Sequence, residues 1–291
     1  MTKKAKKRPD SLKIPNVIIY TAKFLQLFSR KWCTKFCARL FTTPIRHKIP
    51  KREHDMESRS KQQLIFVPSI AKEVMLYTFG SGPKKILLAH GWSGRGTQLV
   101  KIAERLVEEG YTTYSFDAPA HGKSSGSTTL MPEFIASILE IEKQFGPFEA
   151  AVGYSLGGMS LLNAVKRGFD IKKLVTIGSG DKISDILLDF TRRMKLDNKV
   201  ADEMRDYFEA SFIGETMEGY SAYIAAKEVE IPVLVIHDND DFEVPAKCAI
   251  NIHKHLPDGQ LMLTKGLGHR KILGDPAVIE QTLDFIKNNT L

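Results

Sequence analysis

From residue 64 onward, short apolar runs alternate with segments of helical periodicity, and this alternation constrains the fold more than any other feature. The runs at 86–89 and 233–236 are apolar throughout, as expected for strands buried on both faces. A strand, a helix and a further strand in succession require a parallel sheet with helices packed on it. The sequence therefore predicts an α/β fold with a mostly parallel, twisted sheet. Further strands are expected at 64–67, 74–77, 112–116, 150–152, 174–177 and 261–263, and helices at 98–109, 133–145, 156–167, 245–256 and 276–288.

One interval interrupts this alternation. Residues 181–230 have helical spacing, many charged side chains and no good strand, although strands are expected on both sides. We therefore predict a small helical cap insertion over one edge of the sheet. Its apolar residues either line an acyl pocket or, as we favour, anchor the insertion to the sheet. These residues include Ile186, Leu187, Leu188, Phe190, Tyr207, Phe208 and Phe212.

The first 61 residues differ from the rest of the chain in charge. They hold 17 Lys and Arg residues against 4 Asp and Glu, while the whole chain carries +8, so the remainder is mildly acidic. A main domain with a net negative charge is not suited to binding nucleic-acid phosphates. Apolar residues recur every three or four positions from 17 to 40, which predicts an amphipathic helix. Pro44 and residues 46–61 are interpreted as its end and a linker, so the predicted domains are 1–61 and 62–291.

The predicted N-terminal helix has two interpretations. Its apolar face docks on the main domain, or residues 14–42 make weak peripheral contact with an anionic membrane. The chain has no run of about 18 apolar residues, so a transmembrane helix is not expected, and its start lacks the cleavage site of a signal peptide. Three cysteines, with Cys33 and Cys37 one helical turn apart, suit a reducing compartment. A cytoplasmic protein is expected, associated in the second interpretation with the inner face of the membrane.

The sequence Gly153-Tyr154-Ser155-Leu156-Gly157 lies between an expected strand and an expected helix. A serine on a sharp turn of this kind needs small neighbours, because larger side chains would prevent the close approach of strand and helix. The N-terminus of the helix then points at the negative charge that develops on an attacked carbonyl oxygen. Ser155 is therefore the predicted nucleophile. The alternative is a passive serine in a glycine-rich turn.

A serine hydroxyl becomes a good nucleophile only when a base takes its proton. His269 follows the last expected strand on a glycine-containing loop, from which it can reach Ser155, and is the predicted base. A carboxylate is then needed to fix the tautomer of the base, and the acidic cluster after 233–236 supplies three candidates. The competing histidines are His237, His253 and His255, and the candidate carboxylates are Asp238, Asp240 and Asp241.

Acyl transfer also needs two backbone N–H groups that bind the oxyanion of the tetrahedral intermediate. One is expected from Leu156, the residue after the nucleophile, and the other from Trp92 in the His-Gly turn that follows 86–89. A plain glycine turn is the alternative interpretation of the segment around Trp92.

The chain resembles the α/β-hydrolase superfamily in five motifs that occur in the superfamily's order. They are His90-Gly91-Trp92, Asp117-Ala118-Pro119-Ala120-His121-Gly122-Lys123-Ser124, the turn around Ser155, Asp241-Phe242-Glu243-Val244-Pro245 and Gly268-His269. A bacterial subgroup with His-Gly-Trp-Ser-Gly and Gly-Leu-Gly-His-Arg motifs is similar as well. The resemblance implies an α/β-hydrolase fold and the chain order Ser, Asp, His. It further implies that Asp241, three residues before Val-Pro, is the acid, and that His121 is structural.

Together these features predict a serine hydrolase that acts on a small-molecule carboxylester or thioester through a Ser-His-Asp triad and an acyl-enzyme. A peptidase or an acyltransferase on the same triad is the alternative, since the fold does not separate these activities. A non-catalytic, ligand-binding hydrolase homologue is less favoured. The sequence has no metal-ligand spacing, so neither a metal nor another cofactor is expected.

Overall fold

The computed structural model describes residues 14–212 and 214–288. The chain divides into two compact units, each of which is described by itself. The sheet unit comprises Thr42–Lys182 and Glu218–Leu291, and the helical unit comprises Met1–Phe41 and Ile183–Met217.

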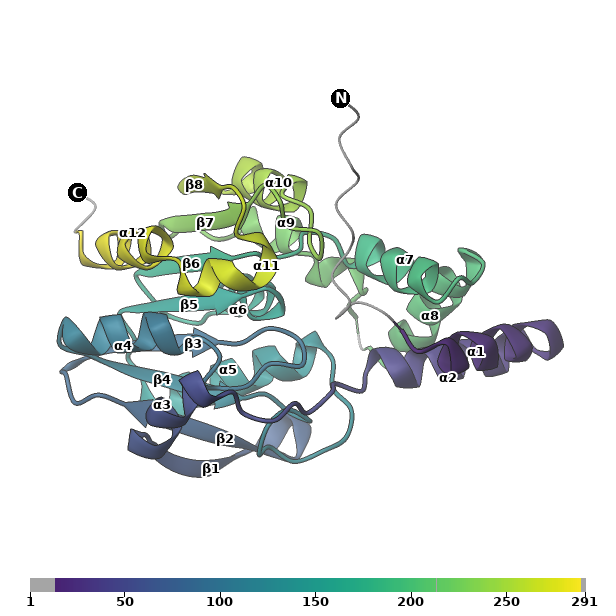
Figure 1. Ribbon diagram of the computed structural model, residues 1–291, viewed down its shortest axis with the longest axis horizontal. Helices are drawn as coiled ribbons and strands as arrows, with labels where there is room; N and C mark the ends of the chain where they lie inside the picture. Colours follow the sequence, from purple (N-terminus) through teal and green to yellow (C-terminus); the bar gives the residue numbers. More distant parts are fainter. Residues whose placement is uncertain (1–13, 213, 289–291) are drawn as a thin grey trace. The chain divides into compact units, whose positions relative to one another are not determined.

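One eight-stranded sheet forms the centre of the sheet unit (Figure 1). Its strands are β1 (Lys61–Val67), β2 (Lys72–Phe79), β3 (Lys84–Ala89), β4 (Tyr111–Asp117), β5 (Ala150–Tyr154), β6 (Lys173–Ile177), β7 (Val233–Asp238) and β8 (Gly259–Thr264). They lie in the order β1-β2-β4-β3-β5-β6-β7-β8. β2 runs antiparallel to both of its neighbours, and every pair from β4 to β8 is parallel. The predicted α/β fold with a mostly parallel sheet is therefore confirmed.

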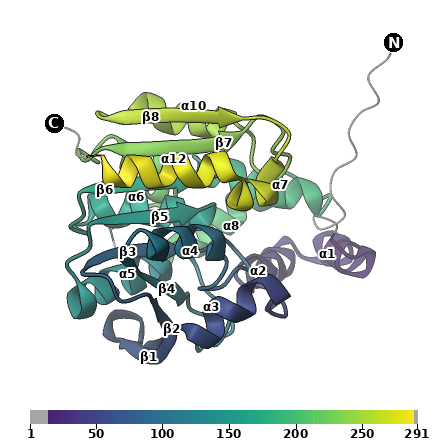
Figure 2. The same ribbon diagram turned by 60° about the vertical axis from the view of Figure 1, so that its left-hand side comes forward.

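Helices cover both faces of the sheet (Figure 2). In the sheet unit they are α3 (His54–Arg59), α4 (Val100–Glu108), α5 (Met131–Phe145), α6 (Leu156–Lys166), α9 (Ala222–Ala226), α10 (Lys247–His255), α11 (Gly268–Lys271) and α12 (Pro276–Lys287). α4 and α12 are neighbours on one face, and α5, α6, α9 and α10 follow one another on the other face. Leu88, Val152 and Ile236 of the central strands share one buried apolar cluster with Ile102 of α4 and Leu283 of α12. This two-sided burial explains why the central strands are apolar at every position.

The predicted linker 46–61 is an ordered part of the sheet unit. The Arg46 guanidinium donates three hydrogen bonds of 2.7–3.0 Å to backbone carbonyls of the loop 120–126. Glu53 is fully buried, and its carboxylate lies 2.8 Å from the Arg95 guanidinium. A buried carboxylate needs such a partner, because burial of a lone charge costs several kcal/mol. Charged side chains therefore hold this segment on the sheet unit.

The helical unit contains α1 (Asn16–Phe28), α2 (Arg30–Phe41), α7 (Ile183–Arg193) and α8 (Lys199–Glu209). The predicted single N-terminal helix is broken at Ser29, whose backbone is extended at φ −160° and ψ 113°. The Ser29 hydroxyl accepts a hydrogen bond from the Trp32 N–H at 3.4 Å, as serine does when it caps the start of a helix. Within the described residues, no helix combines the length and the apolar character needed to cross a bilayer.

Within the helical unit, α2 packs against the two insertion helices. The Arg30 guanidinium lies 2.9 Å from the Glu203 carboxylate of α8. The Phe41 ring lies 5.3 Å from the Phe190 ring and 5.9 Å from the Phe208 ring, measured between centroids. The contacts therefore join the N-terminal helices to the insertion in one unit. Sequence periodicity identifies an apolar face but does not show which distant element will cover it.

Candidate active site

The predicted turn around Ser155 is a strand-turn-helix junction. β5 ends at Tyr154 and α6 begins at Leu156, so Ser155 is the one residue between them. Its backbone has φ 53° and ψ −118°. A positive φ is costly for a residue with a Cβ and is retained only where the surroundings impose it. Here the Ser155 N–H donates to the Ile177 carbonyl of β6 at 2.8 Å, which ties the turn to the sheet.

The glycines of this turn are sterically required. A Cβ at Gly153 would lie 2.5 Å from the Gly158 Cα, and a Cβ at Gly157 would lie 2.3 Å from the Ala89 carbonyl oxygen. Both neighbours are backbone atoms, which cannot move aside as the end of a side chain can. Strand β5 and helix α6 can approach this closely only because these positions lack side chains.

The three residues expected from sequence meet at the carboxyl ends of β5, β7 and β8. The His269 Nδ1 lies 2.6 Å from the Asp241 Oδ2, and the His269 Nε2 lies 3.2 Å from the Ser155 Oγ. The distances form an unbroken chain from carboxylate through imidazole to hydroxyl. Tyr154 holds the histidine in place, since its hydroxyl donates to the His269 carbonyl at 3.0 Å and the two rings are 4.9 Å apart.

The Asp241 carboxylate is held in a fixed orientation. Its Oδ1 accepts hydrogen bonds from the Glu243 N–H at 2.8 Å and the Val244 N–H at 2.9 Å, which leaves Oδ2 facing His269. Burial alone would raise the pKa of Asp241. Hydrogen bonds from His237 and His269 outweigh that effect and hold the pKa well below its ordinary range, so the carboxylate is ionised.

His237 has a place that sequence reasoning did not assign to it. Its side chain is fully buried, with Nε2 at 2.9 Å from the Val244 carbonyl and 3.4 Å from the Asp241 Oδ2. The histidine at the end of β7 therefore contacts the same carboxylate oxygen as His269, and no contact joins it to Ser155 as a competing base. Its position four residues before Asp241 was the available signal, but the side-chain direction at a strand end depends on the turn that follows.

The remaining candidates from the sequence lie outside this chain of contacts. Asp238 accepts from the Leu267 and Gly268 N–H groups at 3.1 and 2.9 Å, and so fixes the loop that carries His269. His253 and His255 lie on α10, where each ring pairs with a backbone carbonyl. These groups support the fold and do not contact Ser155.

The loop after β3 lies against the serine turn. A Cβ at Gly91 would lie 3.0 Å from the Ser155 Cβ, so the backbone passes directly beside the serine. The Gly91 N–H donates to Gln98 and the Ser93 N–H donates to His121, each at 3.0 Å. Between them, the Trp92 N–H takes part in no hydrogen bond recorded for the described residues, and neither does the Leu156 N–H at the start of α6. For Leu156 this follows from its place in the first turn of α6, where N–H groups have no intrahelical partner.

Two buried histidines hold this loop in place. The His90 Nε2 accepts from the Ala118 N–H, the His121 Nε2 accepts from the Ser93 N–H, and the rings lie 4.9 Å apart. Burial lowers the pKa of His90 to about 4. It also lowers the pKa of His121 to about 3, with the nearby His90 as the second cause. Ala120 takes a left-handed φ of 65° in the same loop.

Because both rings are neutral when folded, stability should depend on pH. Unfolding restores an ordinary histidine pKa of about 6.5, so between that value and about pH 4 the unfolded chain binds more protons. The free energy of unfolding should then fall with decreasing pH, by about 1.4 kcal/mol per pH unit for each histidine. Urea unfolding at pH 7, 6 and 5 measures this slope. In a His121→Asn variant the free energy of unfolding should depend less steeply on pH. Equal slopes in the variant and the unaltered protein would contradict a neutral, buried His121 in the folded state.

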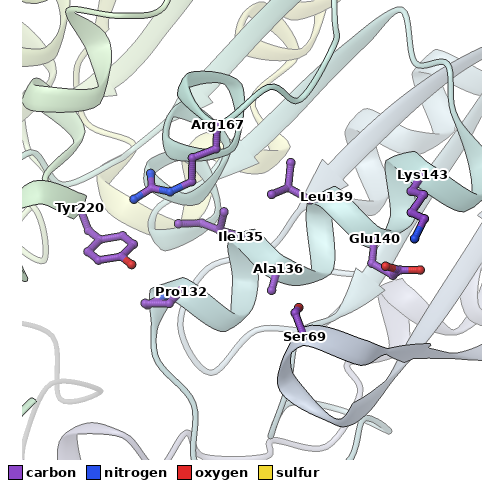
Figure 3. A pocket seen from close by; sticks show the side chains of 9 residues that line it. All are labelled: Ser69, Pro132, Ile135, Ala136, Leu139, Glu140, Lys143, Arg167 and Tyr220. Atoms are coloured by element: carbon purple, nitrogen blue, oxygen red, sulfur yellow. The ribbon is translucent and has the colours of Figure 1, made fainter. Parts of the chain in front are cut away.

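A shallow hollow of about 330 Å³ lies elsewhere in the sheet unit, and none of the three aligned residues lines it. Figure 3 shows its wall along α5, with Tyr220 and Arg167, the residue that follows α6, facing it. The Arg167 guanidinium lies 4.7 Å from the Tyr220 ring and donates to the Asn163 side chain at 2.9 Å. The arginine is therefore engaged by the protein itself, and this hollow offers no comparable set of reactive groups.

Comparison with known proteins identifies the family. The model of the alpha/beta hydrolase family matches residues 86–282. Comparison with curated protein sequences gave no match.

Solved structures share the fold at low sequence identity. A bromoperoxidase from Bacillus anthracis is 19% identical with a TM-score of 0.62, over 78% of this chain and 100% of its own. An esterase from Exiguobacterium antarcticum is 17% identical with a TM-score of 0.62, over 78% of this chain and 100% of its own. An esterase from Pyrococcus furiosus is 18% identical with a TM-score of 0.63, over 84% of this chain and 97% of its own.

Proposed function

The chain belongs to the alpha/beta hydrolase family, and from this premise we propose that it is a serine hydrolase that cleaves a carboxylester or thioester through an acyl-enzyme. The observation that carries the proposal is the contact chain from Asp241 through His269 to Ser155, with distances of 2.6 and 3.2 Å. Esterases among the structural neighbours agree with this choice of substrate class.

The first step is attack by the serine. Ionised Asp241 accepts the Nδ1–H of His269, so Nε2 is the free base that faces Ser155. As the Ser155 Oγ attacks the carbonyl carbon, its proton moves to Nε2, and Asp241 stabilises the imidazolium that results. The strained turn presents Oγ at the carboxyl edge of the sheet and so removes the need for the serine to reorient.

The second step is collapse of the tetrahedral intermediate. The Trp92 and Leu156 N–H groups donate to the oxyanion, and the N-terminal end of α6 adds its positive potential there. His269 returns its proton to the leaving alcohol or thiol, and the acyl group remains on Ser155. Water, activated by the same histidine, then releases the acid and restores the free enzyme.

The proposal is tested with a panel of p-nitrophenyl esters of increasing acyl length, an acyl thioester and an aminoacyl p-nitroanilide. We expect turnover of esters and thioester, with a fluorophosphonate probe inactivating the protein at one equivalent per chain. Cleavage of the anilide alone would show that the protein is a peptidase and not an esterase. Acyl transfer to an added alcohol in preference to water would indicate an acyltransferase. Absence of both turnover and probe labelling would overturn the proposal.

A further inference from the structure

The helical unit exposes a cluster of large apolar side chains, here called the aromatic patch. Their exposed fractions lie between 60 and 84%. Soluble domains seldom present so much contiguous apolar surface unless something binds it. The members of the aromatic patch are Val17, Tyr20, Phe24, Leu27 and Phe28 of α1 and Trp32 at the start of α2.

The aromatic patch occupies one side of α1. Its five α1 members recur at spacings of three and four residues, which places them on one stripe of about 100° at 100° per residue. The other side of α1 is already covered, since Ile19 and Ala22 are buried and the Cys33 Sγ of α2 donates to the Ala22 carbonyl. The Phe24 and Phe28 rings lie 4.7 Å apart on the exposed side. α1 is therefore apolar on both faces, and only one face is used within the helical unit.

The segment that carries the aromatic patch is basic. Residues 16–41 contain five Lys and Arg residues and no Asp or Glu. Lys23 is adjacent to Phe24, and the Lys35 ammonium lies 5.6 Å from the Trp32 ring centroid. The preceding residues 1–13 add six Lys and Arg against one Asp in the sequence. A surface that covers the patch must accept apolar side chains together with the lysines beside them, Lys23 and Lys35.

We propose that the aromatic patch docks the protein on an anionic lipid surface. Apolar and aromatic side chains enter the boundary between headgroups and acyl chains, while lysine and arginine pair with the anionic headgroups. Tyr20 and Trp32 suit this boundary because each has an apolar ring and a polar group. With 13 residues, α1 is about 20 Å long and so lies along the surface, since a span needs about 30 Å.

Charge distribution favours lipid over a second copy of this chain. A self-complementary contact would bring two clusters of the same positive sign together, which is unfavourable. A bilayer with anionic lipids offers negative charge and an apolar layer in the same surface. This docking does not depend on the hydrolase chemistry, and its test uses binding alone.

The test is co-sedimentation of the full chain with vesicles of phosphatidylcholine and phosphatidylserine in a three to one mixture. We expect binding to these vesicles, weaker binding to pure phosphatidylcholine, and release as salt rises to about 0.5 M, where screening is strong. The double variant Leu27→Ser/Phe28→Ser should weaken binding about tenfold or more, because it removes apolar area from the patch. The double variant Lys31→Gln/Lys35→Gln should weaken it by a similar factor and reduce its dependence on salt.

A matched control is available on the sheet unit. Leu64 and Phe66 of β1 are 51 and 54% exposed, so Leu64→Ser/Phe66→Ser makes the same chemical change at two apolar residues that do not belong to the aromatic patch. This variant should bind vesicles like the unaltered chain, and circular dichroism checks that all variants remain folded. Equal loss of binding in the control and patch variants would overturn the proposal. So would a dimer in solution that the Leu27→Ser/Phe28→Ser change dissociates, without vesicle binding by the unaltered chain.

Discussion

Replacing Ser155 with alanine is expected to lower kcat for p-nitrophenyl ester hydrolysis about 10⁴-fold or more and to abolish fluorophosphonate labelling. Alanine lacks the oxygen that attacks the carbonyl and forms the acyl-enzyme. The backbone should be unaffected, because φ 53° at this position is no more strained for alanine than for serine. The residual rate reports what the oxyanion donors and substrate binding achieve without a nucleophile.

A second serine on the same helix serves as the control for this experiment. The Ser160 hydroxyl donates to the Leu156 carbonyl at 2.8 Å within α6, so it has no part in the chain of contacts at His269. Ser160→Ala should retain full labelling by the probe and activity within about threefold of the unaltered protein. Undiminished labelling of Ser155→Ala, or its loss in Ser160→Ala, would show that Ser155 is not the nucleophile.

Asp241→Asn should lower kcat by about 10⁴-fold while leaving the fold intact, through a change of tautomer at His269. The Glu243 and Val244 N–H groups both donate to Oδ1, so the oxygen of the new amide must remain there. The amide nitrogen then takes the position of Oδ2 and donates to the His269 Nδ1. The ring proton is forced onto Nε2, where the histidine faces Ser155 as a donor and cannot accept its proton.

The neighbouring aspartate provides a matched comparison, because Asp240→Asn makes the same chemical change one residue away. The side chain at position 240 has no place in the proposed chemistry, so kcat should change by less than about twofold. Steady-state kinetics with p-nitrophenyl acetate distinguish the two variants. A loss below tenfold in Asp241→Asn, or an equal loss in Asp240→Asn, would remove Asp241 from the proposed triad.

Features with local causes could be predicted from the sequence. The run 86–89 is apolar because β3 is buried on both faces, and residues 153 and 157 are glycines because strand and helix approach within van der Waals contact. Each signal lies in a few consecutive residues. The proximity of Ser155, Asp241 and His269 follows in turn, since the carboxyl ends of neighbouring parallel strands share one edge of the sheet.

Features that depend on distant partners could not be predicted in this way. A charged residue such as Glu53 is ordinarily exposed to solvent, and its burial is explained only by the Arg95 guanidinium beside it. The stripe from 17 to 40 predicts one helix, because the extended backbone at Ser29 matters only once α1 folds back against α2. His237 contacts Asp241 because the chain turns between them, and the periodicity of the sequence does not predict the path of that turn. In each case the sequence identifies the residue but does not indicate which distant residue it contacts.

The helical unit is assembled from two stretches of chain separated by most of the sheet unit. During synthesis, α1 and α2 leave the ribosome well before α7 and α8 exist. At roughly 5–20 residues per second, the intervening chain takes about 7–30 seconds to produce. For that interval the face of α2 that contacts the insertion, including Arg30 and Phe41, has no insertion helices to cover it. The nascent chain therefore presents more apolar surface than the finished protein does, at the end that is made first.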